Sequence, residues 1–251
     1  MRKIFLLLFW TAGLLLFGAC LHTPPIMIAK YTAQEPDARL QGDVWKHTPE
    51  YHFQPYTAGK WYDEIECTSG MRGRVLESGT VKLLWNEKFL FVGVKMKDSD
   101  LVDEAKRDQT HIFTQADAVE LFIKPEKQSH YWEIYGSVNA KKTCYFFPGR
   151  GRLGLSSNNV YRHGVEVQTI CNGTLNFYGD RDQGWTMLLK VSSDELIRHG
   201  AKWGKAEPWL IHLVRHNYSV HLPSREVSVY PAFSAGNPHF HEGYAVLSLE
   251  K

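Results

Sequence analysis

The stretch TVKLLWNEKFLFVGVKMKD (residues 80–98) decides the fold class, because it places two apolar runs around a short polar turn. The turn is NEK (86–88), and every second residue from Leu90 to Met96 is apolar. Alternation with a period of two is typical of a strand that buries one face. Two such runs joined by a few turn-forming residues predict a β-hairpin.

Further short apolar runs, separated by turn residues, repeat this strand pattern. SSDELIRHG (192–200) alone predicts a helix, which Ser192 or Ser193 caps and Gly200 ends. Many strands with one short helix predict an all-β fold, a β-sandwich of mostly antiparallel strands. The other predicted strands are DAVELFIKP (117–125), the YWEIYGSVNAKKTCYFF region (131–147), GVEVQTI (164–170), GWTMLLKV (184–191), PWLIHLVRHNY (208–218) and GYAVLSLE (243–250).

The N-terminus predicts an export signal over residues 1–19, since two basic residues precede a long apolar run. LLLFGAC (14–20) resembles the bacterial lipobox, in which the cysteine thiol is acylated and the chain is cut ahead of it. We therefore expect lipid attachment at Cys20 and a location in the bacterial cell envelope, on the periplasmic side or at the cell surface. An uncleaved membrane helix is the alternative, because the run approaches the ~20 residues that span a bilayer.

The mature chain is expected to consist of a tether and one domain. Residues 20–38 are polar and contain proline, as suits a tether, and residues 39–251 would form the sandwich. Without Arg2 and Lys3 the 29 Lys+Arg fall to 27, equal to the 27 Asp+Glu. No basic field then remains to attract nucleic acid.

The cysteines and histidines give no clear metal signature. Cys67, Cys144 and Cys171 lack CxxC spacing, and an oxidising compartment would allow one disulfide among them with one thiol left over. His239 and His241 lie two apart on one strand face, a spacing that can ligate a metal. Ordinary polar histidines near a strand end are the alternative, so we expect no metal site.

Strand parity places several polar and aromatic side chains on one sheet face. Glu120 lies opposite the apolar face of its strand, and the alternate residues from Tyr131 to Asn139 form a polar and aromatic row in the next strand. If the apolar faces point to the core, these side chains form a surface of flat rings beside hydrogen-bonding groups, which suits sugars. An ordinary solvated sheet face is the alternative.

Four segments resemble successive elements of the family 9 carbohydrate-binding module and its relatives, in the family's order. The resemblance covers roughly Leu40 to the C-terminus. It implies a β-sandwich that binds glycans without catalysis and that often works beside a glycoside hydrolase. The segments are VKLLWNEKFLFVGVKMKDSDL (81–101), QADAVELFI (115–123), TLNFYGDRDQGWTMLLKV (174–191) and PHFHEGYAVLSL (238–249).

The resemblance also implies site residues. Glu120 matches an acidic residue that hydrogen-bonds sugar, and Asp117 matches the Asp that opens that strand, where capping of the loop backbone is an equal expectation. Family members grip a sugar between two aromatic residues, for which Phe113 and Phe240 are the candidates here. The whole predicted carbohydrate-binding set is Phe113, Glu120, Tyr135, Asn139, Arg215, Phe240 and His241.

The resemblance leaves cofactors open to two interpretations. Some relatives bind calcium, to which Asp180 and Asp182 would contribute oxygens, although a plain polar turn explains them better. Some members of the wider sandwich group hold haem, for which Met96 and the histidines at 239–241 are candidate ligands. Met96 also continues the core parity of its strand, so no cofactor is expected.

Two other functions compete with glycan binding. Glycoside hydrolysis requires a pair of carboxylates; Asp117 and Glu120 point to opposite faces, but Glu120 and Glu133 share a face of adjacent strands. A lipoprotein that uses the same aromatic face to bind a protein is the other alternative. The prediction is a polysaccharide or oligosaccharide ligand, with a glycoside hydrolase as partner.

Overall fold

The computed structural model describes residues 23–56, 74–153, 161–232 and 237–251. The predicted signal peptide (1–19), Cys20 and Cys67 lie outside these residues. Nearly all of the regular secondary structure in the described chain is strand: β1 (Ile26–Tyr31), β2 (Tyr51–His52), β3 (Gln54–Pro55), β4 (Gly79–Trp85), β5 (Phe89–Met96), β6 (Ala118–Pro125), β7 (Tyr131–Ser137), β8 (Lys142–Phe147), β9 (Val165–Asn172), β10 (Gly184–Ser192), β11 (Trp209–Asn217), β12 (Glu226–Tyr230) and β13 (Ala245–Glu250).

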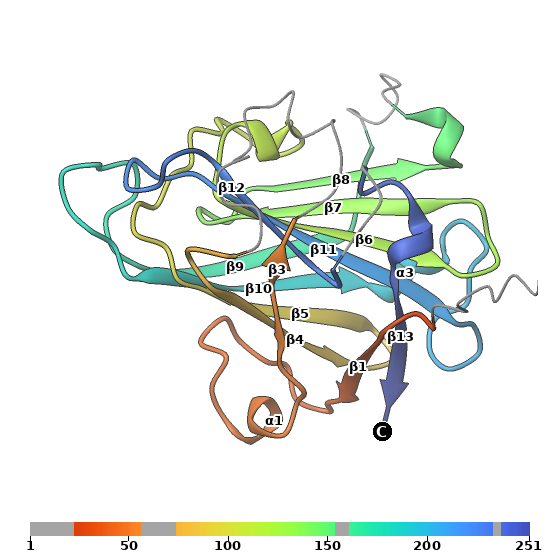
Figure 1. Ribbon diagram of the computed structural model, residues 1–251. Helices are drawn as coiled ribbons and strands as arrows, with labels where there is room; N and C mark the ends of the chain where they lie inside the picture. The colour runs from red at the N-terminus through yellow and green to blue at the C-terminus, as the bar shows by residue number, and fades with distance from the viewer. Residues whose placement is uncertain (1–22, 57–73, 154–160, 233–236) are drawn as a thin grey trace, which may run out of the picture.

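The strands form one continuous ladder that folds over on itself. Its order is β8-β7-β6-β11-β13-β1-β4-β5-β10-β9, with β12 on β11, β3 on β12 and β2 on β4. Figure 1 shows β8, β7 and β6 in the upper part of the molecule and β5, β4 and β1 in the lower part. Most pairs are antiparallel. The predicted all-β sandwich of mostly antiparallel strands is confirmed.

The main core lies between the two halves of this ladder. Val92 and Leu189 face it from one half, and Leu121 and Ile134 face it from the other. Of these, Val92, Leu121 and Ile134 are residues that strand parity assigns to the apolar faces. Burial of each large apolar side chain stabilises the fold by ~1.5–3 kcal/mol relative to exposure, before chain entropy is counted.

The predicted hairpin is confirmed by the pairing of β4 with β5, where Trp85 faces Leu90. Asn86 fixes the turn between them, because its side-chain oxygen accepts hydrogen bonds from the backbone N–H groups of Lys88 and Phe89, each at 2.9 Å. An Asn side chain that bonds the backbone ahead of it is a common turn device.

Residues expected in a tether instead form a central strand. β1 lies between β13 and β4 and runs parallel to both. Its sequence IMIAKY places Met27 and Ala29 in the main core, both fully buried. The prediction of a tether over residues 20–38 is therefore wrong for Ile26–Tyr31. The prolines on either side of this short strand made the whole segment look like a linker.

The described residues contain two short α-helices where one was expected. The predicted helix is confirmed as α3 (Ser193–Ile197): Ser192 caps it by accepting a hydrogen bond from the N–H of Asp194. The additional helix is α1 (Asp43–Lys46), which has no side-chain cap. Its buried Trp45 packs over Gly93 of β5, so tertiary packing rather than local sequence holds it.

A second buried cluster covers the outer face of β6, β7 and β11. It contains Phe122, Tyr131 and Tyr135 from the sheet, together with Ile112 and Tyr244 from the segments that lie over it. The 3-10 turn η2 (Ile112–Thr114) belongs to one covering segment, and η5 (His241–Gly243) belongs to the other. The polar and aromatic face predicted from parity is thus correctly grouped but buried, and the expectation that it is a solvent-exposed surface is wrong.

Candidate functional site

Four polar side chains meet on this covered face: Glu120, Glu133, Tyr135 and His216, called here the Tyr135 cluster. The hydroxyl of Tyr135 lies 2.7 Å from Oε1 of Glu120 and 2.5 Å from Oε1 of Glu133. Nε2 of His216 lies 2.9 Å from Oε2 of Glu120. The cluster exists because β7 and β11 flank β6, which places Tyr135 opposite Glu120 and His216 diagonally beside it.

The Tyr135 cluster is neutral rather than ionised. Burial raises the pKa of Glu120 to about 8, and burial followed by the nearby Glu120 charge raises the pKa of Glu133 well above its usual range. Burial also lowers the pKa of His216, so the imidazole is uncharged. Desolvation disfavours the charged form of every member, which leaves uncharged hydrogen-bonding groups.

Phe113 is the part of this region that reaches the surface. Its half-buried ring stacks on Tyr135 with centroids 6.0 Å apart and an interplanar angle of 23°, and lies 5.7 Å from the His216 ring. Glu120 is only 4% exposed, and both of its oxygens are engaged inside the protein. The structure therefore brings Phe113, Glu120 and Tyr135 together, but in this conformation a glycan reaches only Phe113.

Arg215 and Asn139 lie apart from the Tyr135 cluster. Val214 faces Glu120 across the strands, so Arg215 points to the opposite side of the sheet. There its guanidinium donates to the carbonyl of Lys97 at 2.6 Å and lies 3.4 Å from Asp98. Asn139 is exposed in the turn after β7 rather than on the strand. Both were predicted site residues, and neither shares a surface with Glu120.

Phe240 and His241 belong to the segment that covers the other end of β7. The ring of His241 lies 4.5 Å from that of Tyr131 in an edge-on contact. Phe240 is 41% exposed, with the guanidinium of Arg150 5.2 Å from its ring centre. Arg150 also pairs with Glu242 at 2.8 Å. An exposed ring beside a fixed ion pair gives this segment both stacking and hydrogen-bonding capacity.

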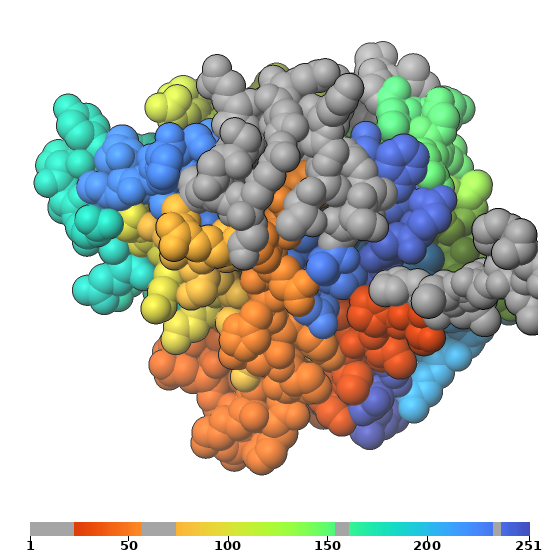
Figure 2. Space-filling model, in the orientation of Figure 1, coloured from red at the N-terminus to blue at the C-terminus, as the bar shows by residue number. Residues whose placement is uncertain are grey.

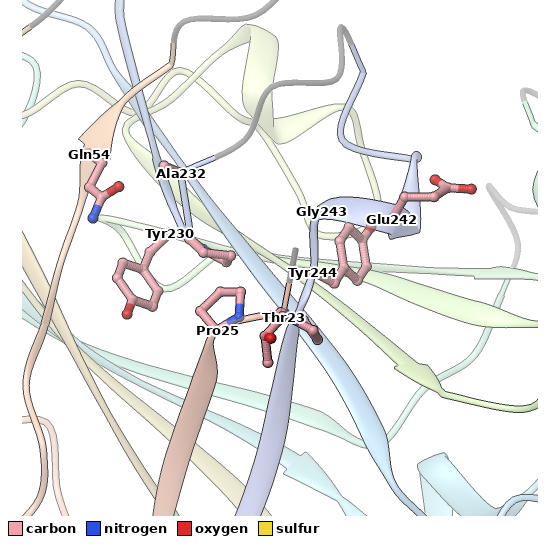
Figure 3. A pocket seen from close by; sticks show the side chains of 10 residues that line it. Thr23, Pro25, Gln54, Tyr230, Ala232, Glu242, Gly243 and Tyr244 are labelled. Atoms are coloured by element: carbon pink, nitrogen blue, oxygen red, sulfur yellow. The ribbon is translucent and has the colours of Figure 1, made fainter. Parts of the chain in front are cut away.

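A cavity of about 400 Å³ adjoins this segment, and sequence reasoning missed it. Figure 3 shows Gln54, Tyr230 and Pro25 on one side of it and Gly243 and Tyr244 on the other. This volume lies within the usual range of small-ligand sites. No local pattern signals the cavity, because segments far apart in sequence supply its walls.

Asp117 has the loop-capping role that was one of its two expectations. It is fully buried, and its two oxygens accept hydrogen bonds from the backbone N–H groups of Val102 and Tyr218, each at 2.6 Å. These bonds tie the segment after β5 and the loop after β11 to the start of β6. Asp117 therefore shapes the site without facing a ligand.

The residues considered for hydrolysis are not arranged for it. The Tyr135 hydroxyl fills the space between the Glu120 and Glu133 carboxylates. A glycosidase pair must flank a sugar bond and, in inverting enzymes, leave room for water. In this conformation the two acids cannot do so.

The candidate haem and calcium ligands have structural surroundings. Met96 is buried in the main core near Phe53. His239 instead contacts Phe122, which belongs to the second buried cluster, so Met96 and His239 lie in different clusters. Asp182 accepts hydrogen bonds from the N–H groups of Leu101 and Thr174, both at 2.7 Å. Among the residues that the structure describes, no group of three or more His, Cys, Asp or Glu is placed to hold a metal ion.

The two described cysteines are not paired with each other. Cys144 is a buried free thiol and Cys171 an exposed one, while the third candidate, Cys67, lies outside the described residues. Within the described part of the chain, no helix has the length and apolar character needed to cross a membrane.

The fold and this site define a class: a β-sandwich with a buried polar network beneath aromatic groups at its surface. Residues 37–170 match the family described as carbohydrate family 9 binding domain-like. This match spans more than half of the chain, and the protein belongs to that family. Among curated proteins, none matches the sequence.

Solved structures that share the fold include the following three. A Bacteroides uniformis ATCC 8492 protein that has been proposed to bind carbohydrate superposes with a TM-score of 0.66 at 11% identity, covering 91% of this chain and 100% of its own. A family 9 carbohydrate-binding module from Caldicellulosiruptor kristjanssonii with bound cellotriose gives 0.55 at 14% identity, with 90% and 93% covered. A glucose complex of a family 9 module from the same organism gives 0.54 at 13% identity, with 90% and 95% covered.

Proposed function

We propose that the protein binds carbohydrate as a non-catalytic module. The observation that carries this proposal is the family match over residues 37–170, which includes Phe113, Glu120 and Tyr135. Family 9 modules of the same fold have been solved with cellotriose and glucose, so β-glucan fragments are the first ligands to test. The neutral Tyr135 cluster supports the proposal, because an uncharged interior of hydroxyl and carboxyl groups holds the overlying aromatic ring in a fixed place.

The proposed glycan surface runs from Phe113 to Phe240. Phe113 lies over Tyr135, and His241 lies over Tyr131, four residues earlier in β7. The two positions are therefore roughly 13 Å apart along the strand, a span suited to an oligosaccharide rather than one sugar ring. Aromatic rings at both ends would cover apolar sugar faces, and Arg150 beside Phe240 would bond hydroxyls.

Glu120 acts on this surface by positioning. Its carboxyl group holds the Tyr135 hydroxyl, and the Tyr135 ring supports Phe113. Loss of that support would displace the Phe113 ring, although no group that contacts the ligand would be removed.

A glycan array that includes cellotriose, probed with the full-length protein in detergent, tests the function. Phe113→Ala and Phe240→Ala should each weaken binding to the best ligand by about tenfold, the equivalent of ~1.4 kcal/mol. Ile197→Ala, at an exposed position on α3, should bind as the wild type does. Absence of binding to every glycan, or a haem absorbance band in place of binding, would refute the proposal.

Lipid anchoring and the envelope location are also proposed, on the support of LLLFGAC (14–20) and the preceding apolar run. An anchored module would hold its glycan close to the cell, where a glycoside hydrolase acting on the same polymer is the proposed partner.

A further inference from the structure

The loop that joins β9 to β10 carries the two most exposed aromatic rings of the described chain. Tyr178 is 77% exposed and Phe177 is 52% exposed. Their ring centroids are 6.4 Å apart with an interplanar angle of 29°, so the two rings lie close together and nearly parallel. In Figure 2 this loop projects, in teal, from the left edge of the molecule.

The loop is held from within. The buried Asp182 carboxylate accepts hydrogen bonds from Leu101 on one side and Thr174 on the other. Asn176 exchanges two hydrogen bonds with the backbone of Asp103, at 2.7 and 2.8 Å. A loop anchored to a neighbouring segment in this way presents its side chains in a fixed position, which lowers the entropy lost on binding.

Two glycines permit this arrangement. A Cβ at Gly173 would lie 2.0 Å from Oδ1 of Asp182, so glycine allows that carboxylate to approach the backbone. A Cβ at Gly179 would lie 2.6 Å from the Phe177 ring, so the ring rests against the backbone there and still exposes half of its surface. The first contact fixes the base of the loop, and the second holds the Phe177 ring against the backbone with its outer side exposed.

Hydrogen-bonding groups surround the two rings. Asp180 and Arg181 follow them and are exposed. Nε2 of His221 lies 3.2 Å from the carbonyl of Asp180, which places the loop after β11 against the β9–β10 loop two residues beyond Tyr178. That loop adds Val220, which is 63% exposed. Exposed rings bordered by polar groups match the two faces of a sugar, its C–H surface and its hydroxyls.

We propose that Phe177 and Tyr178 form a second saccharide-binding surface, which stacks on the sugar rings of a polysaccharide chain. The proposal rests on the carbohydrate-binding function proposed above. Both residues are more than half exposed, and such open access suits the interior of a polymer. Figure 1 shows the β9–β10 loop at the opposite end of the view from the segment that precedes β13, which carries Phe240.

Two separated surfaces on one rigid domain predict avidity. A long chain that contacts both surfaces binds more tightly than a short one, because the second contact becomes intramolecular. A trisaccharide would reach only one. The second surface should therefore contribute to polymer binding and leave cellotriose binding unchanged.

The test compares amorphous cellulose with cellotriose, using the full-length protein in detergent. Phe177→Ala/Tyr178→Ala should weaken cellulose binding by at least about tenfold and leave cellotriose affinity and melting temperature unchanged. The matched control is Phe177→Tyr/Tyr178→Phe, which exchanges the two rings and should bind cellulose as the wild type does.

The outcomes separate the two proposals. If the double alanine variant binds cellulose as tightly as the wild type, the second surface is refuted while glycan binding stands. If it loses cellotriose binding as well, the loop belongs to the first surface and the second-site proposal is overturned. If the wild-type protein binds neither ligand, the β-glucan form of the function and the second surface both fail.

Discussion

Tyr135 has one hydroxyl hydrogen and two carboxyl neighbours at hydrogen-bond distance, so it can donate to only one of them. The other must carry a proton and donate to the phenol oxygen. Glu120 and Glu133 therefore cannot both be ionised while this geometry persists. Because these hydrogen bonds need a proton on one of the two carboxyl groups, the packing of this sheet face depends on pH.

Glu120→Gln should change how stability depends on pH. The pKa of Glu120 is about 8 in the folded protein against 4.5 as the ordinary value. A raised carboxyl pKa favours folding fully below pH 4.5, and this stabilisation is lost as the pH rises through about 8. The variant should thus match the wild type near pH 5 and exceed its unfolding free energy at pH 9 by on the order of 3 kcal/mol.

Thermal melts from pH 5 to 9 measure this effect. Glu133 has the same sign of shift, so part of the slope should remain in the variant. Glu104→Gln, at an exposed position, serves as the control and should leave the profile unchanged. Equal slopes for wild type and Glu120→Gln would show that the carboxyl group of Glu120 is not protonated in the folded state.

Elements with a clear period could be predicted from the sequence, whereas those held by distant contacts could not. The hairpin of β4 and β5 and the α3 cap at Ser192 follow from local patterns. α1 has no cap and depends on Trp45 over Gly93, and β1 depends on strands more than 50 residues away. Neither dependence is written in the local sequence.

The candidate site was also only partly predictable from the sequence. Parity correctly grouped Glu120 with Tyr135, because alternation fixes which side chains share a face. It did not predict their burial, since the segment around Ile112 and the segment before Tyr244 cover the face without any periodic signal. Arg215 was misassigned because its position in β11 sets it on the opposite face to Glu120.

Gly93→Ala tests the packing of α1. An added Cβ would lie 2.5 Å from the Trp45 ring, so the ring must move. Overpacking of this kind typically costs ~1–3 kcal/mol, and the melting temperature should fall accordingly. Gly151→Ala is the matched control, because a Cβ there meets nothing within 4 Å. An unchanged melting temperature for Gly93→Ala would mean that α1 shifts freely on the sheet.

At the scale of the whole molecule, the two proposed glycan surfaces and the chain entry occupy different parts of one sandwich. The β9–β10 loop projects at one end of the view in Figure 1, and residues 23–25 enter β1 beside the start of β13. Val246 donates to the carbonyl of Pro25 at 2.8 Å, which fixes the point of entry. A protein attached through that entry would keep the Phe177–Tyr178 surface away from the attachment.

Cys20→Ser tests the proposed attachment. Acylation requires the thiol, so the variant should lose incorporation of labelled fatty acid and should retain residues 1–19, because cleavage at the lipobox follows acylation. Mass spectrometry of the purified protein and fractionation of labelled cells measure both effects. Cys171→Ser, which removes an exposed thiol elsewhere, should leave both unchanged. Continued labelling of Cys20→Ser would show that lipid is attached at another residue.

The position of β1 between two parallel neighbours has a mechanical consequence. Tension on the chain ahead of Ile26 acts along the axis of β1, so its ladders with β13 and β4 are loaded in shear, and their hydrogen bonds share the force. Tension perpendicular to a strand would break such bonds one at a time. If the chain is anchored through this end, as proposed, a force on a captured polymer would load the β1 ladders in shear.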